Sequence, residues 1–520
     1  MEQYKYHTSD TNCNKDQNIA LLYYCPVIYK KMWILQFLLA FLVCLFITKY
    51  LKMKWAARSL PPGPSPLPLI GNLWTLSFHL HPLTLSKLAN IYGNIYTIWM
   101  GQTPVVVLHG YEAVRNALVA HSEELSGRPV TSFLSDITQG KGIVASNGHN
   151  WKQQRRFGLM TLRNLGVGKR GLEARIQEQA QCLVELFREK NGKPMDASYM
   201  IIHAVANVIS AVVFGHCFSF DDKTFQKLVA VNNHLIENIG SSWGRLYDAF
   251  PRLMQYVPGP HKKTFENQKY MENFVRKEIR FHQVNGTPEE PDDFIDHYLN
   301  QIAKTKDEPD STFDEDNMIQ VAVDLFTAGT ETTATTLQWA LLFMLAHPDI
   351  QVNVRKELDT VLEGSSVINY EDRKRLPYTN AVVHEIQRFA NIASVGMIRC
   401  NLKEITLVGY TFKKGTMILP NIYSVLHETK HWETPYQFNP YNFLDEDGRF
   451  ITKEAFLPFA AGHRVCLGEQ VARFEIFIFF ATLMKAFSFH LPEGVTDVNT
   501  KYKSSITLQP HPYKICAVPR

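Results

Sequence analysis

The sequence lacks the features that mark several large classes of protein. Its eight cysteines are scattered, and no two form a C-x-x-C pair, so neither a zinc site nor a disulfide scaffold is predicted. No run of Lys and Arg is long enough to indicate a nucleic-acid partner, and the formal net charge is only +4. Internal repeats and low-complexity tracts are also absent. What remains is a globular composition, 45% hydrophobic and 20% charged, with most cysteines expected to be buried and inert.

One long apolar segment lies near the N-terminus. Residues 32–51 contain Lys49 as their only charge and are about as long as the ~20 residues that a membrane-spanning helix needs. A cleaved signal peptide is the alternative, but no small-x-small cleavage site follows. Basic residues are in excess after the segment, which favours a catalytic body on the cytosolic side. We therefore predict an uncleaved anchor at 32–51 and a poorly ordered extension at 1–31, and the sequence leaves open whether Met1 or Met32 is the start.

The rest of the chain is predicted to be a linker and one catalytic domain. Residues 52–66 are basic and rich in proline, which indicates a stiff, extended connector. Within residues 67–520, strand-like runs occur early and late, and helical patterns dominate between them. The clearest helix has a capping box at Thr312-Phe-Asp-Glu315, keeps its apolar periodicity to Ala346 and ends at His347-Pro348. The expected fold class is therefore mostly α with small β-sheets around a long central helix.

The strongest chemical signal is the segment Phe459-Ala-Ala-Gly462-His-Arg464-Val-Cys466-Leu-Gly468. Its two glycines allow a tight bend and the close approach of a flat cofactor. A helix is predicted to follow, so that Cys466 lies at a helix N-terminus, which favours a thiolate. Arg464 supplies a cation suited to a carboxylate. A buried, inert cysteine beside a turn would not need this combination.

A second signal lies inside the long helix, at Ala328-Gly329-Thr330-Glu331-Thr332-Thr333. Glycine and threonine are poor choices for a helix interior, and a carboxylate there is costly unless it is paired or used. Gly329 would let a ligand lie against the helix, and Glu331 with Thr332 forms an acid–alcohol pair that can relay protons. The alternative is that the threonines bond back to helix carbonyls while Glu331 lies at the surface.

Two weaker patterns consist of charged residues at helical spacing. Glu385 and Arg388 are three residues apart and predict an ion pair, although such pairs are common on helix surfaces. Trp151 and Arg155 share one helix face and could together hold a carboxylate. A basic amphipathic surface helix is the alternative there.

Together these motifs resemble the cytochrome P450 superfamily. The cysteine segment matches F-x-x-G-x-R-x-C-x-G at every fixed position, and the whole chain after the anchor looks like microsomal family 2, most of all its subfamily J. The resemblance implies the cytochrome P450 fold and a haem b group whose iron takes Cys466 as its axial ligand. It implies that Glu331 and Thr332 deliver protons during oxygen activation, and that Glu385 and Arg388 form a buried structural pair. The residues expected to bind the cofactor are Phe459, Gly462, Arg464, Cys466 and Gly468 of the loop, with Trp151, Arg155, Arg128 and Arg399.

One position departs from the family pattern. The buried pair usually has a third member, Arg or His, in a P-x-[RH]-F segment, whereas here the segment is Pro440-Tyr441-Asn442-Phe443. Asn442 cannot carry a positive charge, so another polar group is expected to complete the contact.

The resemblance also implies a function. The expected activity is a haem-thiolate monooxygenase that inserts one oxygen atom from O2 into polyunsaturated fatty acids such as arachidonate, and into xenobiotics. An isomerase or dehydratase of lipid peroxides and a haem-based sensor are the alternatives; the pair Glu331 and Thr332 argues against both. The apolar pocket is expected to include Phe133, Phe326, Ala328, Val395 and Ile506.

Partners and location follow from the same resemblance. Electrons are expected from an NADPH-dependent reductase, with a b-type cytochrome as a possible helper, and Lys152, Arg155 and Arg156 form a candidate basic docking face. The apolar run Phe250–Val257 is predicted to dip into the bilayer near the substrate entrance. The expected location is the endoplasmic reticulum membrane with the catalytic domain in the cytosol.

Overall fold

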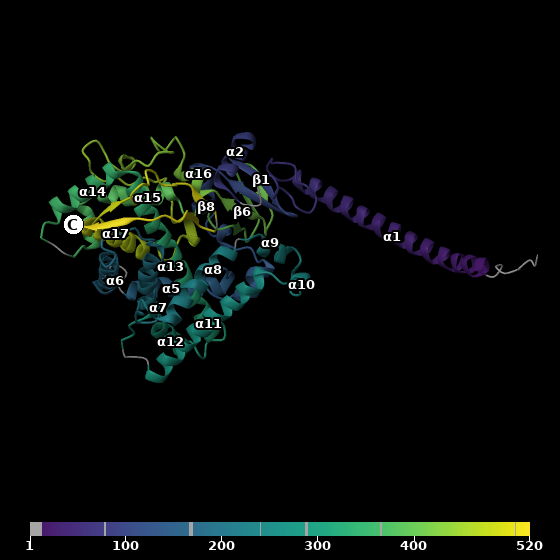
Figure 1. Cartoon of the computed structure of the whole chain (residues 1–520), viewed down its shortest axis with the longest axis horizontal. Helices are drawn as coiled ribbons and strands as arrows, with labels where there is room; N and C mark the ends of the chain where they lie inside the picture. Colours follow the sequence, from purple (N-terminus) through teal and green to yellow (C-terminus); the bar gives the residue numbers. More distant parts are fainter. Residues whose placement is uncertain are drawn as a thin grey trace, which may run out of the picture.

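The computed structural model describes residues 13–76, 80–165, 170–239, 241–286, 290–364, 367–504 and 506–520. Helices make up most of the body, and the strands form small separate sheets among them (Figure 1). This confirms the predicted class, mostly α with small sheets. The helices are α1 Cys13–Ala57, α2 Pro82–Tyr92, α3 Tyr111–Arg115, α4 Ser132–Thr138, α5 Gly148–Asn164, α6 Arg170–Arg188, α7 Ser198–Val213, α8 Lys223–Ile239, α9 Ser242–Ala249, α10 Pro251–Met254, α11 Pro260–Asn285, α12 Phe294–Lys304, α13 Glu315–Ala346, α14 Pro348–Val361, α15 Pro377–Ala390, α16 Ile422–Leu426 and α17 Glu469–Ala486.

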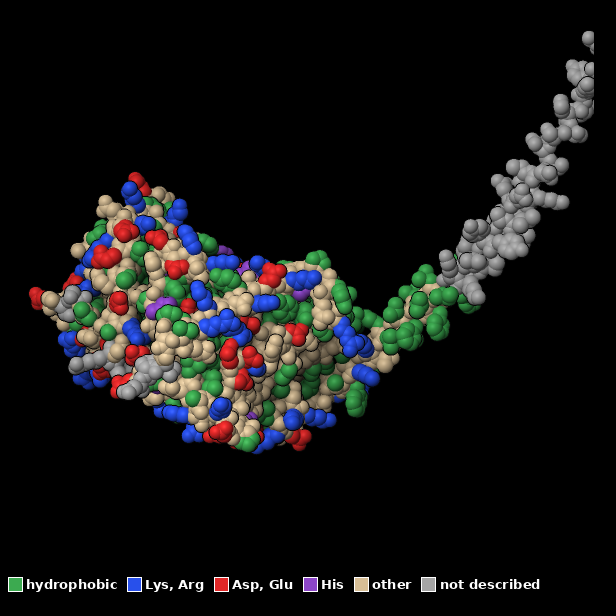
Figure 2. Space-filling view, turned by 90° about the horizontal axis from the view of Figure 1, so that it is seen from below, with side chains coloured by type: hydrophobic (Ala, Val, Ile, Leu, Met, Phe, Trp, Pro, Cys, Tyr) green, Lys and Arg blue, Asp and Glu red, His purple; other side chains and the backbone are tan. Residues whose placement is uncertain are grey.

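The N-terminal helix α1 projects from the body as a long rod (Figure 1). It begins before and ends after the predicted anchor at 32–51, so that residues 52–57 of the predicted linker are helical. Its segment Met32–Ala57 is long and apolar enough to cross a membrane. The body covers almost none of this segment, and hydrophobic side chains cover its surface (Figure 2). Such a surface needs a nonpolar environment.

The prolines after α1 are fastened to the body. Thr97 donates its backbone N–H to the carbonyl oxygen of Pro62 at 2.9 Å. Gly63 lies so close to the same strand that a Cβ would come within 1.9 Å of the Thr97 carbonyl oxygen. Asn72 donates its side-chain amide to the Pro64 carbonyl at 3.3 Å. Of the predicted connector, the proline segment after α1 is therefore outside any helix and held against the body, whereas residues 52–57 are helical.

The largest sheet joins the two ends of the catalytic domain. Its strands run in the order β1-β2-β6-β3, with β2 parallel to β6 and the other pairs antiparallel. β3 begins with Arg399, and its next residue, Cys400, forms a β-bridge with Gly127. The sheet therefore places Arg399 near Gly127, in the segment that follows β2. The strands of this sheet are β1 Ile95–Met100, β2 Thr103–Leu108, β6 Met417–Pro420 and β3 Arg399–Cys400, and the two-stranded sheets are β4 Ile405–Leu407 with β5 Tyr410–Phe412, β7 Phe487–His490 with β10 Cys516–Pro519, and β8 Tyr502–Ser504 with β9 Leu508–Pro510.

The central helix α13 has 32 residues and is therefore about 48 Å long. The predicted capping box at Thr312 is wrong. The N-cap is Asp314, whose Oδ1 accepts the backbone N–H of Asn317 at 2.7 Å. Thr312 instead bonds to helix α5, because its backbone N–H and its hydroxyl both donate to Gln153 Oε1, at 2.9 and 2.8 Å.

The prediction that Gly329 opens the helix to a ligand is also wrong. A Cβ at Gly329 would lie 2.5 Å from Cγ1 of Ile209 on α7. The missing side chain therefore lets α7 and α13 pack closely.

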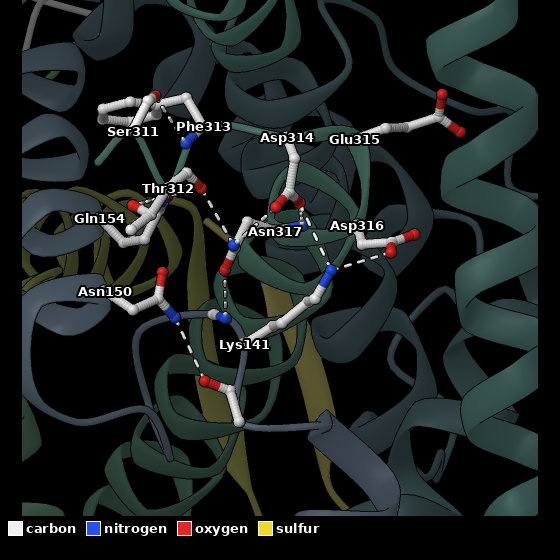
Figure 3. Close-up of polar contacts among 12 residues, drawn as sticks. Lys141, Asn150, Gln154, Ser311, Thr312, Phe313, Asp314, Glu315, Asp316 and Asn317 are labelled. Carbon is white, nitrogen blue, oxygen red and sulfur yellow. Dashed lines mark hydrogen bonds and ion pairs between the residues drawn. The ribbon is translucent and has the colours of Figure 1, made fainter. Parts of the chain in front are cut away.

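A polar cluster holds the start of α13 against the segment that leads into α5 (Figure 3). Lys141 Nζ lies between two carboxylates, 2.8 Å from Asp316 and 3.5 Å from Asp314. Gln154 of α5 donates its side-chain amide to the Thr312 carbonyl oxygen at 2.9 Å. These contacts fix the position of α5, the helix that carries Trp151 and Arg155.

The predicted pair Glu385 and Arg388 lies in the core and is fully buried. Arg388 binds the carboxylate through two nitrogens, each at 2.7 Å, the bidentate geometry that favours such pairs. Asn442 fills the place of the family's third charged residue: its side-chain amide donates to both oxygens of Glu385, at 3.3 and 3.4 Å. The backbone N–H of Asn439 donates to the same carboxylate at 2.8 Å. Neutral donors thus complete the contact.

The substitution Asn442→Asp should destabilise the protein strongly. It would place a second carboxylate against Glu385 in a buried site, so we expect the free energy of unfolding to fall by about 3 kcal/mol or more. Chemical denaturation of the purified protein measures this. Asn439→Asp is the control, because this side chain faces Thr434 and Tyr441 rather than Glu385; equal losses in the two variants would contradict the explanation.

Candidate active site

The cysteine loop folds back tightly on the segment after α3. Gly462 has a φ of +75°, and a Cβ there would lie 1.8 Å from the Leu118 carbonyl oxygen. The next residue, His463, donates its backbone N–H to Ser122 Oγ at 2.6 Å. Only glycine fits this position, so the prediction that Gly462 permits a tight bend agrees with the structure, and the neighbour that requires it is now known.

Cys466 lies two residues before Gly468, the N-cap of α17. Its backbone N–H donates to the Phe459 carbonyl oxygen at 3.1 Å, which closes the loop. Burial raises the pKa of the Cys466 thiol, while the backbone N–H of Gly468 and the charge of Arg155 oppose the rise without cancelling it. The backbone N–H at the start of α17 therefore acts in the predicted direction, toward the thiolate, and coordination to a metal ion would deprotonate the thiol.

Four arginines predicted from the sequence gather beside the loop. Arg464 donates to the carbonyl oxygens of Ser126, Ile143 and Ser146, at 2.7, 3.0 and 2.6 Å. Its guanidinium carbon lies 3.9 Å from the centre of the Trp151 ring. The main contacts of Arg464 therefore fasten the loop to residues 126–146.

The other three arginines surround Arg464. Arg155 donates to the Val465 carbonyl at 2.6 Å, and Arg128 donates to the Ile398 carbonyl at 3.0 Å. Burial, followed by repulsion from neighbouring arginines, lowers the pKa of Arg399 to about 10 and that of Arg464 to about 9. Within the described part of the chain, no carboxylate pairs with any of the four. The cluster is therefore a concentrated, uncompensated positive charge.

Unused hydrogen-bond donors point to what would neutralise this charge. Among the described residues, Arg399 has two buried nitrogens without a partner, Nε and Nη1, and Trp151 has its buried Nε1. Leaving such donors unsatisfied costs free energy unless a ligand accepts their bonds. A Cβ at Gly468 would meet no protein atom within 4 Å. A flat group that carries carboxylates and lies against the cysteine fits both observations, as a haem with its two propionates would.

Comparison with known proteins identifies the family. The family model described as Cytochrome P450 matches residues 61–517. The chain belongs to the cytochrome P450 family. It is 41% identical to cytochrome P450 2J5 of Mus musculus over 93% of this chain and 95% of that protein. It is 41% identical to cytochrome P450 2J2 of Homo sapiens (89% and 92%) and 39% identical to cytochrome P450 2C23 of Rattus norvegicus (91% and 96%).

Membership makes this P450 a haem-thiolate monooxygenase of lipophilic substrates, as its sequence predicted. It implies a haem cofactor and a redox partner, and the apolar helix α1 fits a membrane anchor.

The acid and the alcohol of α13 lie in different surroundings. Thr332 donates its hydroxyl to the Ala328 carbonyl oxygen at 2.8 Å, as the alternative interpretation of the threonines expected. Glu331 is not at the surface: it is 5% exposed and accepts hydrogen bonds from Thr335, Thr507 and Gln509, at 3.1, 2.5 and 3.0 Å. Two of these donors belong to the β8–β9 hairpin. Glu331 thus fastens that hairpin to α13. Thr332 and Ala328 are four residues apart and share a different face of α13, on which Ala328 is exposed.

The predicted pocket residues do not form a single wall. Phe133 packs against Tyr247 and Phe265. Phe326 packs in the core against Phe214 and Phe225, away from the exposed Ala328. The segments that contain Val395 and Ile506 do lie side by side. Leu508 donates its backbone N–H to the Ile392 carbonyl oxygen at 2.9 Å. This bond joins the hairpin that contains Ile506 to the segment that contains Val395.

Two carboxyl groups near the site, one partly buried and one buried, were not singled out from the sequence. Asp324 of α13 accepts the backbone N–H groups of Ile143 and Val144, at 2.7 and 2.9 Å. Burial raises its pKa. Burial also raises the pKa of Glu475 on α17 to about 8, although Thr333 donates a hydrogen bond to it. A carboxylate inside an apolar helix, the signal that identified Glu331, would have identified both.

The substitution Gly462→Ala should prevent formation of the cysteine loop. The added Cβ would overlap the Leu118 carbonyl, so we expect a loss of about 3 kcal/mol or more in unfolding free energy and little protein with bound haem. The haem-to-protein ratio after purification measures this. Gly415→Ala is the matched control, because Gly415 has a similar φ of +87° but no atom within 4 Å of its Cβ position. If both variants kept the same haem content, the close approach to Leu118 would not be the constraint.

Proposed function

We propose that this P450 hydroxylates and epoxidises polyunsaturated fatty acids such as arachidonate, and oxidises xenobiotics, with a haem b group and electrons from NADPH. The observation that carries the proposal is the cysteine loop beside four arginines that no carboxylate of the described residues neutralises. The fatty-acid substrates follow from the resemblance to subfamily J. The apolar character of Phe133, Val395 and Ile506 accords with a lipophilic ligand.

The chain's own residues would hold the cofactor in two ways. Cys466 would be the axial ligand, and Arg399 with Trp151 would bind a propionate through nitrogens that have no partner among the described residues. Arg128 and Arg155 would add positive charge, while Arg464 keeps the loop in place through backbone carbonyls. Phe459 and the two glycines of the loop would shape the surface against the ring. When bound, the haem supplies the reduction of O2 and the transfer of one oxygen atom to the substrate.

Proton delivery would depend on Thr332 more directly than on Glu331. The Thr332 hydroxyl is partly exposed and bonds only to the Ala328 carbonyl in the described structure, so rotation about one bond would free its proton. Glu331 already accepts three hydrogen bonds and is tied to the hairpin. Glu331 would therefore act as a proton reservoir reached through Thr332, or after movement of the hairpin.

Two other functions are possible for a haem-thiolate protein. An isomerase or dehydratase of lipid peroxides needs no reductase and no proton relay, and a sensor needs no substrate pocket. The partly exposed Thr332 hydroxyl beside the exposed Ala328 favours the monooxygenase, since a relay group has no use in either alternative.

The redox partner would be an NADPH-dependent reductase, with a b-type cytochrome as a second donor. Of the predicted basic docking face, Lys152 and Arg156 are exposed, whereas Arg155 is bonded to the Val465 carbonyl. We expect Lys152 and Arg156 to steer the partner, so that electron transfer slows as the salt concentration rises.

The membrane would be that of the endoplasmic reticulum, with the body on the cytosolic side. Helices α9 and α10 lie at the end of the body from which α1 departs (Figure 1). Three apolar side chains around α10 point outward: Phe250, Leu253 and Tyr256 are 53%, 61% and 80% exposed. An outward apolar patch beside an anchor is expected to enter the bilayer surface.

Hydrogen exchange tests this orientation. In lipid discs, we expect backbone amides of residues 250–257 to exchange about tenfold more slowly than in detergent-free solution of an anchor-deleted form, because lipid would shield them. Helix α14, at the opposite end of the body, is the internal control and should exchange equally in both. Equal exchange of the two regions in lipid and in solution would contradict insertion.

Reconstitution with reductase, NADPH and a panel of fatty acids and drugs tests the activity. We expect oxygenated fatty acids as products and a red-shifted Soret band in the reduced, carbon monoxide-treated protein. Cys466→Ser should abolish both, because oxygen does not supply thiolate ligation. Thr332→Ala should keep the band but lower product per NADPH by about tenfold or more. Product formed from added peroxide without NADPH, and none with NADPH, would favour the isomerase instead.

A further inference from the structure

A second cluster of metal-binding side chain types lies far along the chain from the cysteine loop. His282 is near the end of α11, Asp293 is the N-cap of α12, and Asp296 is in the first turn of α12. Their exposed fractions are 9%, 3% and 4%. One nitrogen or oxygen atom from each residue lies within 4.8 Å of the others. A buried group of one imidazole and two carboxylates needs a physical explanation, because buried charges are costly unless they are compensated.

The hydrogen bonds of His282 restrict its state. Its Nδ1 lies 2.8 Å from the Glu278 carbonyl oxygen, which can only accept, so Nδ1 carries a proton. Its Nε2 lies 2.8 Å from Asp293 Oδ2, which is a second acceptor. A neutral ring would therefore turn a lone pair toward a carboxylate. Either a proton lies between Nε2 and Asp293 Oδ2, on one atom or the other, or a cation lies between Nε2 and the carboxylates.

Asp296 favours the cation. Its Oδ1 is buried and has no hydrogen-bond partner among the described residues. A doubly protonated His282 would bring one positive charge to two carboxylates, and would leave this oxygen unsatisfied. A divalent cation with a neutral imidazole would balance both carboxylates and would take Oδ1 as a ligand.

The residues around the cluster are arranged as they usually are around metal ligands. Metal-binding histidines usually donate their other ring N–H to a backbone carbonyl or a carboxylate, as His282 does to Glu278. The turn after α7 closes the cluster, because a Cβ at Gly215 would lie 2.5 Å from Asp293 Oδ2. Next to it, His216 pairs with the Glu278 side chain at 3.0 Å without joining the three.

We propose that His282, Asp293 and Asp296 bind one zinc ion that ties the end of α11 to the start of α12. One imidazole nitrogen with carboxylate oxygens suits zinc, at distances of about 2.0–2.2 Å. The cluster contains no cysteine, so the spacing of the cysteines in the sequence could not have predicted it. The ion would be structural: it would hold in place α11, which packs on α8 and α13. The proposal is independent of the monooxygenase activity.

Metal content of the full-length haem protein tests the site. The protein is stripped with a chelator, given zinc chloride, and passed through a desalting column; zinc is then measured against haem iron. We expect one zinc per haem in the native sequence, and about tenfold less in Asp296→Asn and His282→Gln. His216→Gln is the matched control, since it alters the neighbouring pair only, and it should keep its zinc. Native protein with no more zinc than Asp296→Asn would overturn the proposal, as would an equal loss in His216→Gln.

X-ray absorption at the zinc edge decides the matter if the variants fail to fold. Haem iron does not contribute at that edge, so the native protein can be measured intact. A shell of nitrogen and oxygen at about 2.0–2.2 Å with the scattering of one imidazole supports the assignment. Sulfur ligands, or oxygen ligands alone, would show that zinc binds elsewhere and would overturn it.

Discussion

The repulsion among four arginines beside the cysteine loop constrains the centre of this P450. Burial lowers the pKa of all four arginines, and repulsion from neighbouring arginines lowers those of Arg128, Arg399 and Arg464 further. Their guanidinium groups donate hydrogen bonds to backbone carbonyls of segments far apart in the sequence. These bonds hold residues 126–146, 397–398 and 464–465 together. A group that supplies negative charge would offset the cost of burying these arginines together. The arginine cluster is thus both the support of the cysteine loop and the clearest sign that a carboxylate-bearing cofactor belongs beside it.

The sequence predicted those features that depend on residues close together along the chain. The cysteine loop, the anchor helix and the pair Glu385 with Arg388 all follow from short motifs, and each lies where its motif indicated. The start of α13 was misplaced because two capping patterns overlap: Thr312 is bound by Gln153 of α5, so that Asp314 caps instead. No rule of local sequence distinguishes the two without knowing that α5 lies there.

Features that depend on distant residues could not be predicted. Gly329 looked like an opening for a ligand, yet its neighbour is Ile209, 120 residues earlier, on a helix whose position the sequence does not reveal. Asn442 looked like a missing charge, yet neutral donors satisfy Glu385. Glu331 belongs to the same group, because its partners Thr507 and Gln509 lie near the C-terminus and bond across the core. Each case is a contact between elements that only the tertiary structure brings together.

The fastening of the proline connector has a consequence for how the enzyme sits on its membrane. Because Pro62, Gly63 and Pro64 are held against Thr97 and Asn72, only residues 58–61 lie between the end of α1 and the first proline that is bonded to the body. The anchor is therefore expected to be connected to the body rigidly rather than through a flexible linker. A tilt of the helix in a thicker or thinner bilayer would therefore be expected to change the orientation of the whole body relative to the membrane surface.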